Sequence, residues 1–323
     1  MGPTARTDQH RLPPVGAFGP LIALLFTCLF FSTQSDRFLT LENLSLVMQQ
    51  VMVVGVIAIG QTLVILTGGI DLSCGMVMAL SAMLMARLAV EPIGSTPLAI
   101  LCGLGVGALF GAVNGALVTR VKLPPFIVTL GTLNIAFATM QIYSHGQTVT
   151  GLPTGLIWLG NDLAIGAASI DYGVVLMLLL YFGMWVCLRE TAAGRHVYAV
   201  GINPEGARLA GIATGRVLLG VYVIAGLFYG VAALLSVSRT GVGDPQAGQT
   251  ENLDAITAVV LGGTSLFGGR GVILGSLVGA LIVGALRNGL TLMGTPSVYQ
   301  ILITGILVIL SVMVDRLSRR GEQ

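Results

Sequence analysis

The feature that most constrains this chain is a series of apolar runs, each close to twenty residues long, separated by short interruptions. A helix of about 20 apolar residues spans the hydrocarbon core of a bilayer and satisfies all its own backbone hydrogen bonds. Only 9% of the 323 residues are charged, which is too few to cover the surface of a soluble protein. The sequence therefore predicts an all-α integral membrane protein.

About ten transmembrane helices are expected. The first apolar run follows basic residues, as a secretory signal does, but no small-residue cleavage pattern comes after it, so we expect a retained helix. The glycine-rich stretch GGTSLFGGRG interrupts the eighth and ninth candidates, whose limits are the least defined. The predicted spans are about 15–31, 43–67, 72–90, 96–119, 125–143, 171–188, 216–238, 252–268, 271–292 and 298–314.

The charged residues predict the orientation, because cytoplasmic loops of membrane proteins are enriched in lysine and arginine. With ten spans and both termini cytoplasmic, one side receives a large group of basic residues: Arg6, Arg11, Arg120, Lys122, Arg189, Arg195, Arg208, Arg216, Arg270, Arg316, Arg319 and Arg320. The other side receives Arg37, Arg87 and Arg239 together with seven of the fourteen acids: Asp36, Glu42, Glu91, Asp162, Asp171, Asp244 and Glu251. We expect a single transmembrane domain over 1–323, with cytoplasmic segments at 1–14, 189–215 and 315–323.

Glycines recur at every fourth residue in two of the runs. One series is Gly103, Gly107, Gly111 and Gly115, and the other is Gly271, Gly275 and Gly279. Residues four apart share one helix face, and glycine there lets a second backbone approach closely. Both series are predicted to be helix-packing seams.

Two local similarities link the halves of the chain. GIDLSCG at 69–75 is similar to GTSLFGG at 263–269, and GALFGAVNG at 107–115 is similar to GALIVGALRNG at 279–289. Transporters are often built from internal repeats, so one interpretation is a duplication of two halves. Chance similarity between glycine-rich helices is the alternative.

Several chemistries find no support in the sequence. The stretch GLGVGA at 103–108 matches a dinucleotide fingerprint only formally, since it lies inside a predicted span. The glycine-rich stretch at 262–271 lacks the Gly-Lys-[Ser/Thr] ending of a phosphate loop. The four cysteines and three histidines form no metal-ligand spacing, and no catalytic constellation is present. We expect no cofactor, no metal and no enzymatic activity in this chain.

Polar residues within the spans are candidates for a solute path. Gly68 and Gly69 break the second span, and Asp71 and Ser73 are acceptors suited to the start of the next helix. A capped helical hairpin and a re-entrant break lining the path both fit this pattern. The path candidates are Gln61, Asp71, Ser73, Asn114, Asn134 and Asn288; hydrogen bonds between helices are the alternative explanation for them.

A polar island at 189–216 separates two largely apolar regions, and its four arginines and two glutamates make it a dense charge cluster for a chain with only 9% charged residues. One interpretation is a solvated loop between two spans. The other is a docking element for a soluble partner. Pro204 suits a first helical position, Glu205 suits a helix N-terminus and Gly211 offers a stop, which predicts a short helix here.

Taken together, five stretches resemble one family. They are GQTLVILTGGIDLSCG (60–75), LPPFIVTLGT (123–132), GRHVYAVGINPEGARLAGI (194–212), the segment 251–290 and YQILITGILVILSVMVDR (299–316). The chain resembles the inner-membrane permeases of bacterial ABC importers, above all the ribose-type sugar permeases, which are related to branched-chain amino-acid permeases. The resemblance implies a multi-pass permease of the bacterial inner membrane that imports a monosaccharide or a related polyol.

The resemblance also implies partners and a coupling site. The partners would be a second permease subunit, identical or different, cytoplasmic ATPase subunits that bind ATP and Mg²⁺, and a periplasmic sugar-binding protein. The coupling helix of the family matches Asn203, Pro204, Glu205, Gly206, Ala207, Arg208, Leu209, Ala210, Gly211 and Ile212. Gly206 stands where many relatives have alanine, which leaves the start of that helix open. A branched-chain amino-acid permease and a secondary carrier or channel are the alternatives.

Overall fold

The computed structural model describes residues 19–91, 94–165 and 168–320. The predicted cytoplasmic tail 1–14 lies outside this part of the chain. The elements are α1 (Gly19–Gln34), α2 (Leu41–Leu66), α3 (Cys74–Val90), α4 (Thr96–Thr119), α5 (Pro125–Ser144), α6 (Thr154–Ile157), the 3-10 turn η2 (Trp158–Gly160), β1 (Asp162–Ile165), β2 (Ala168–Asp171), α7 (Tyr172–Glu190), α8 (Ala192–Ile202), α9 (Pro204–Leu209), α10 (Thr214–Thr240), α11 (Glu251–Leu261), α12 (Ile273–Leu292) and α13 (Ser297–Arg320).

The described chain is largely helical, as predicted. Within it, six helices are long and apolar enough to cross a membrane: α2, α4, α5, α7, α10 and α12. The apolar helices α1 and α3 and the stretch 297–310 of α13 are shorter. The eighth predicted span, 252–268, is wrong as a continuous helix, because α11 has only 11 residues and ends at a glycine-rich loop. In that loop Gly263 has a φ of +83°, a conformation that stops a helix.

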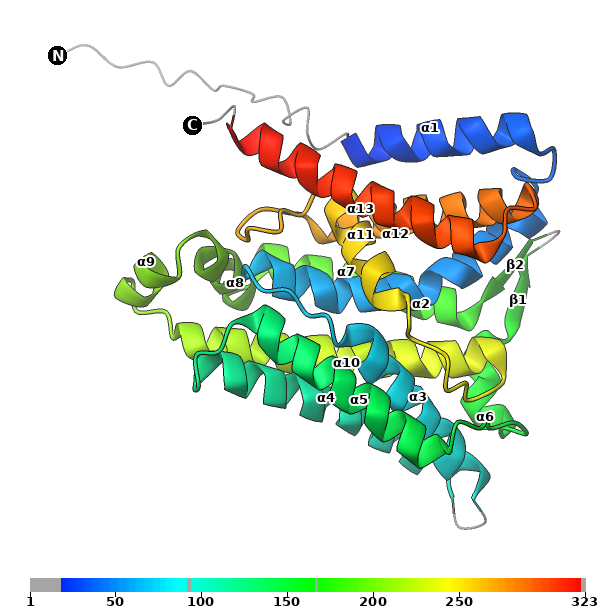
Figure 1. The fold of residues 1–323 in the computed structure, drawn as a ribbon, viewed down its shortest axis with the longest axis horizontal. Coiled ribbons are helices and arrows are strands. Elements are labelled where there is room, and N and C mark those ends of the chain that lie inside the picture. The colour runs from blue at the N-terminus through cyan, green and yellow to red at the C-terminus, as the bar shows by residue number, and fades with distance from the viewer. Residues whose placement is uncertain (1–18, 92–93, 166–167, 321–323) are drawn as a thin grey trace.

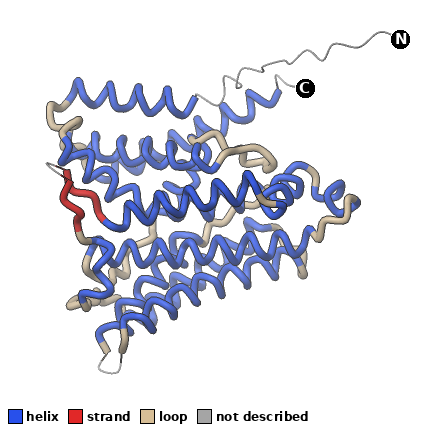
Figure 2. The backbone as a smooth tube through the Cα atoms, turned by 180° about the vertical axis from the view of Figure 1, so that it is seen from behind, coloured by secondary structure: helices blue, strands red, loops and turns tan. Residues whose placement is uncertain are grey.

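The helices lie side by side, and the short elements gather at the two ends of the bundle (Figure 1). α8 and α9 lie at one end, called here the α8–α9 end. At the other end, called the hairpin end, β1 and β2 form an antiparallel pair in which Asp162 faces Asp171 (Figure 2). Among the described residues, this hairpin is the one sheet, and an isolated antiparallel bridge joins Val149 and Gly243. The predicted C-terminal tail also continues α13 as helix up to Arg320.

α2 and α10 form the centre of the bundle. α10 packs against α4, α2 and α3. Most of the apolar stretch of α2 is buried, whereas less than a third of the corresponding stretches of α4, α5 and α7 is buried. A helix that is apolar all round and surrounded by protein belongs to the core, and apolar helices with one bare face suit the lipid.

The glycines of α4 lie against other helices. A methyl group added at Gly107 would overlap the carbonyl oxygen of Gly226 on α10, and one at Gly111 would overlap the carbonyl oxygen of Tyr222. Gly115 also faces α10, and Gly103 faces Met85 of α3. Backbones that approach this closely gain van der Waals contact, which holds helices together where lipid supplies little hydrophobic drive.

The second glycine series differs from its prediction in one member. Gly275 and Gly279 lie on α12 against the carbonyl oxygens of Gly262 and Ala258 at the end of α11. Gly271 precedes the helix, with a φ of +150° and Thr264 against it. The seam between α11 and α12 therefore uses two of the three predicted glycines.

We expect Gly107→Val to destabilise the protein by about 1–3 kcal/mol, because overpacking an occupied site forces backbones apart. Gly105→Val on the same helix is the matched control, since a side chain there meets nothing within 4 Å. The measurement is the temperature at which half of the detergent-solubilised protein no longer elutes as a monodisperse peak. Equal midpoints for both variants would show that the seam does not hold α4 to α10.

Candidate functional site

Two interrupted helices define the middle of the bundle. The long helix α2 is followed by the irregular segment 67–73 and the short helix α3, and the long helix α10 is followed by the irregular segment 241–250 and the short helix α11. In Figure 1 both irregular segments run from an end of the bundle to its middle, where the short helices begin. The element order thus pairs 67–73 with 241–250, and not with 263–269 as the sequence similarity indicates.

The N-termini of α3 and α11 meet. Gly75 lies against the carbonyl oxygen of Gly248, with no room for a side chain. The side-chain amide of Asn252 donates to the carbonyl oxygen of Leu72 over 3.4 Å. We call this region, residues 66–75 and 248–254, the central junction. Two helix N-termini bring exposed backbone N–H groups and partial positive charge into the interior of the bundle.

Some backbone carbonyl groups of 66–73 obtain their hydrogen bonds from distant parts of the chain, whereas the N–H groups of Thr67, Gly68 and Gly69 bond back to the last turn of α2. The carbonyl oxygen of Leu66 accepts from the N–H of Gly269 over 2.8 Å. That of Ile70 accepts from the hydroxyl of Thr129 on α5 over 3.2 Å. An unpaired backbone group in an apolar interior costs several kcal/mol, so irregular backbone is tolerated at this depth only when protein surrounds it.

A polar network extends from the junction into α4, α5 and α10. Asp71 accepts from the backbone N–H of Ser73 over 2.8 Å and from its hydroxyl over 2.6 Å. The hydroxyl of Tyr229 lies 3.2 Å from the second carboxylate oxygen of Asp71. Asn114 donates to the hydroxyl of Ser73 over 3.1 Å and accepts from the hydroxyl of Thr132 over 2.8 Å.

All members of this network are at most 4% exposed. Ser73 precedes α3 but makes no side-chain cap bond, so the predicted cap is replaced by the turn in which Asp71 binds the backbone N–H of Ser73. Two further groups beside the network, the amide nitrogen of Gln61 and the hydroxyl of Tyr222, have no hydrogen-bond partner among the described residues. Buried polar groups without partners are uncommon and mark places where a polar molecule can be bound.

The six predicted path residues divide into three groups. Gln61, Asp71, Ser73 and Asn114 come together at the network, with the hydroxyl of Tyr229 3.4 Å from the side-chain oxygen of Gln61. Asn288 instead pairs with Asn43, each amide donating to the other over 2.9 Å or less. Asn134 lies on the outer face of α5, where its amide donates only to the carbonyl oxygen of Leu130 on the same helix.

Sequence reasoning missed Thr132 and Tyr229 in this network. Tyr229 is 1% exposed and comes from α10, in the half of the chain remote from Asp71. A tyrosine in an apolar span is the signal that was available, because its hydroxyl needs a partner when buried. The partner itself depends on which helices meet, which the sequence does not state.

At the α8–α9 end, the residues predicted to couple to a partner form a capped helix. Asn203 caps α9 by accepting from the backbone N–H of Gly206 over 2.9 Å, and Pro204 occupies the first turn. The helix ends at Leu209, followed by Gly211 with a φ of +85°. The start of the helix, which Gly206 had left open, is therefore Pro204.

The outward face of α9 is bare. Leu209 is 77% exposed, and Ala207 is buried beneath the helix. The Nε of Arg208 donates to Glu205 over 3.0 Å. This hydrogen bond and the positive charge of Arg208 lower the pKa of the Glu205 carboxyl, so the exposed pair is charged at neutral pH. Such a pair adds little stability by itself.

α8 connects this exposed helix to the junction. A methyl group at Gly201 would overlap the carbonyl oxygen of Leu66, and it would lie 2.6 Å from the backbone nitrogen of Gly269. The hydroxyl of Tyr198 donates to the carbonyl oxygen of Gly271 over 3.0 Å. α8 therefore contacts both the end of α2 and the loop that joins α11 to α12.

Apolar spans, interrupted helices with buried polar groups and an exposed short helix at one end together define a multi-pass transport protein of the membrane. The family model described as the branched-chain amino acid transport system/permease component matches residues 43–312. The chain belongs to this family. No solved structure shows a significant match.

Individual relatives are sugar permeases. The chain is 44% identical to the fructose import permease protein FrcC of Rhizobium meliloti, over 97% of this chain and 88% of the relative. It is 40% identical to the ribose import permease protein RbsC of Bacillus subtilis, over 96% and 97% of the two chains. It is 34% identical to the D-allose transport system permease protein AlsC of Escherichia coli, over 92% and 90%. The resemblance to ribose-type permeases is confirmed.

We expect Asn114→Leu to destabilise the protein by roughly 1–3 kcal/mol, because Ser73 and Thr132 lose a buried hydrogen-bond partner. Asn134→Leu is the matched control, since it removes the same amide from an exposed face. Thermal unfolding of the two detergent-solubilised variants compares them directly. A loss for Asn134→Leu as large as that for Asn114→Leu would contradict the importance of the network.

Proposed function

We propose that this chain is the membrane-spanning permease subunit of an ATP-driven importer for a monosaccharide or a related polyol. The observation that carries the proposal is its identity of 34–44% with fructose, ribose and allose permeases over almost its whole length. The names of these relatives favour a sugar over a branched-chain amino acid as the solute. All three relatives are permease proteins, so the solute would cross the membrane through subunits of this kind.

The proposed topology has ten membrane crossings with both termini in the cytoplasm of a bacterial inner membrane. Six long helices, three shorter apolar stretches and α11 together with its irregular segment supply these crossings. The α8–α9 end would face the cytoplasm, because its loops carry Arg120, Lys122, Arg189, Arg195, Arg208, Arg216 and Arg270. The hairpin end would face the periplasm and meet a sugar-binding protein, which selects the solute.

Residues 203–212 would dock onto a cytoplasmic ATPase subunit that binds ATP and Mg²⁺. The bare side chain of Leu209 supports this, because an exposed leucine on a short, capped helix suits a groove on a partner. Through its contacts with Leu66, Gly269 and Gly271, α8 would transmit a movement of the docked helix α9 to the bundle. A displacement of α8 would shift the segment that follows Leu66 and the loop between α11 and α12 together. The first of these, 67–73, is part of the central junction.

A second permease subunit would cover α5. The exposed face of this helix carries Asn134 among large apolar side chains that include Leu130, Ile135 and Phe137. A polar amide facing lipid is unfavourable, and such residues in membrane helices generally face protein or a water-filled path. Asn134 therefore belongs to the proposed path at a subunit interface, whereas Gln61, Asp71, Ser73 and Asn114 belong to it at the junction. Asn288 holds α12 to α2.

We expect Leu209→Asp and Arg208→Glu each to abolish monosaccharide uptake and co-purification of the ATPase subunit. The first places a carboxylate where an apolar contact is needed, and the second puts like charges next to Glu205. Lys122→Glu is the control, because it reverses a basic residue in another loop at the same end. The measurements are uptake into cells, ATPase recovered with the tagged permease, and the amount of permease in the membrane.

Normal uptake by either α9 variant, with normal membrane levels, would contradict docking through α9. Transport by the purified permease without ATP or an ATPase would contradict the importer itself and favour a secondary carrier or channel. Uptake of leucine but of no monosaccharide would instead favour a branched-chain amino-acid permease.

A further inference from the structure

A polar cavity of about 240 Å³ lies within the subunit, on the hairpin side of the central junction. It is lined by residues of α2, α10, α11, α12 and α13 and is open on one side, where Gln50, Arg239 and Thr291 are exposed. Its polar lining consists of Gln50, Ser236, Arg239, Glu251, Arg287, Thr291 and Gln300, and its remaining walls are apolar, including Val51, Val54 and Val283. Glu251 belongs to the junction and lines the cavity, whereas Asp71, Ser73, Asn114, Thr132 and Tyr229 of the polar network do not line it.

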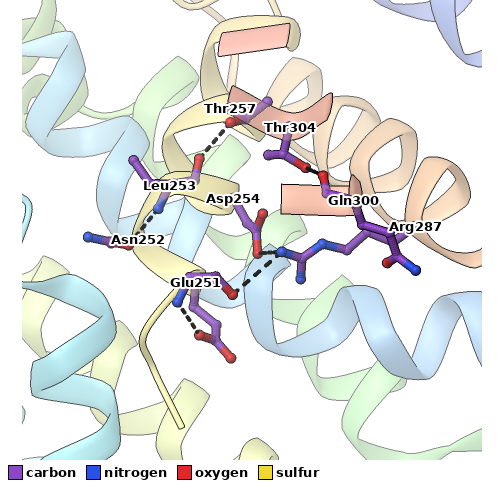
Figure 3. A network of polar contacts seen from close by, with 9 residues as sticks. Glu251, Asn252, Leu253, Asp254, Thr257, Arg287, Gln300 and Thr304 are labelled. Carbon is purple, nitrogen blue, oxygen red and sulfur yellow. Dashed lines mark hydrogen bonds and ion pairs between the residues drawn. The ribbon is translucent and has the colours of Figure 1, made fainter. Parts of the chain in front are cut away.

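Two arginines and one glutamate line this cavity, and a second acid, Asp254, lies behind one of the arginines. Arg287 on α12 reaches Asp254 on α11, with 2.6 Å between the guanidinium and the carboxylate (Figure 3). Arg239 and Glu251 complete the set, which therefore contains two positive and two negative side chains. A balanced set neither attracts an anion nor a cation strongly, but it offers hydrogen-bond donors and acceptors to a neutral ligand.

Part of this hydrogen-bonding capacity is unused. Asp254 is 1% exposed, and neither carboxylate oxygen has a hydrogen-bond partner among the described residues, because its close contact with Arg287 is not aligned as a hydrogen bond. Arg239 is exposed at the edge of the cavity, and it makes no hydrogen bond and no ion pair among the described residues. A buried charge such as that of Asp254 is costly to keep, and such charges are retained in membrane proteins mainly for function.

The size of the cavity limits the ligand. At ~30 Å³ for each water molecule, the cavity has room for about eight waters, which corresponds to one sugar ring and not to an oligosaccharide. Guanidinium and amide groups are donors for sugar hydroxyls, carboxylates are acceptors, and the valines suit the apolar faces of the ring. A neutral, compact, polyhydroxylated molecule matches all three properties.

We propose that this cavity is a monosaccharide-binding site inside a single permease subunit, on the hairpin side of the junction. Arg239, Arg287 and Gln50 donate to hydroxyl groups of the sugar, and Glu251 accepts. Asp254 is a positioning residue that holds Arg287 toward the cavity. The ligand class rests on the proposed function, and the site adds a stopping point within one subunit, separate from any path between two subunits.

The test uses Ser236→Cys in the complete importer reconstituted in vesicles. A small neutral methanethiosulfonate reagent labels the new thiol, and labelling of the wild type is subtracted as background for the four native cysteines. D-ribose, D-fructose and D-allose are each added at increasing concentration. We expect at least one of them to slow labelling threefold or more, and Gln50→Leu to raise the concentration needed about tenfold.

Thr33→Cys on the exposed face of α1 is the control and is expected to label at the same rate with and without sugar. Labelling of Ser236→Cys that no sugar slows would overturn the proposal. Equal slowing at Thr33→Cys would overturn it too, since the effect would then be unspecific. If the reagent does not label Ser236→Cys at all, the cavity does not admit a molecule of this size, and the proposal is overturned as well.

A second variant separates this inference from the function of the importer. Ser236→Phe fills the cavity and leaves its charges in place, so we expect uptake to fall at least tenfold while the ATPase subunit still co-purifies. Leu46→Phe, on the exposed face of α2, is the matched control and is expected to transport normally. Normal uptake by Ser236→Phe would refute the site but leave the importer intact, whereas absence of all monosaccharide uptake in the wild type would refute the importer.

Discussion

The structure depends on one constraint, which is that irregular backbone inside an apolar bundle needs a hydrogen-bond partner for each polar group. Residues 66–73 meet this constraint partly with local bonds to the last turn of α2 and partly with three partners from other parts of the chain: Gly269, Thr129 and Asn252. Because Thr129 lies on α5, Asn252 on α11 and Gly269 in the loop after α11, these three bonds form only when the two halves of the chain have packed together. The junction is thus where the fold is closed.

Glycine allows the surrounding helices to come close enough for this. The seam between α4 and α10 brings Gly107 against Gly226, and the seam between α11 and α12 brings Gly279 against Ala258. At Gly201 the absence of a side chain likewise lets the backbone of α8 contact the carbonyl oxygen of Leu66, where α2 ends. Close backbone contact is stiff, since interiors packed at this density transmit displacement and do not absorb it. A push on α9 is therefore expected to reach the junction through α8.

Two polar places lie on either side of the bundle's middle and differ in character. The network around Asp71 is at most 4% exposed and mostly satisfied, with only the neighbouring Gln61 and Tyr222 carrying unpaired groups. The cavity around Arg239 and Arg287 has open volume and unused hydrogen-bonding positions. The second has the room that a solute requires.

The sequence by itself determined the membrane class, the polar island with its short helix at 204–209, the α4 glycine seam and the family. Each of these depends on residues close together in the chain or on one helix face, where spacing fixes geometry. Only the tertiary structure decided that α11 is a half-length helix, that 67–73 meets 241–250, and that Tyr229 and Thr132 join Asp71 and Asn114. It also moved Asn288 into a pair with Asn43 and Asn134 onto the outer face of α5. The sequence does not identify the hydrogen-bond partner of a polar side chain in a span, because that partner depends on which helices pack together and at what depth.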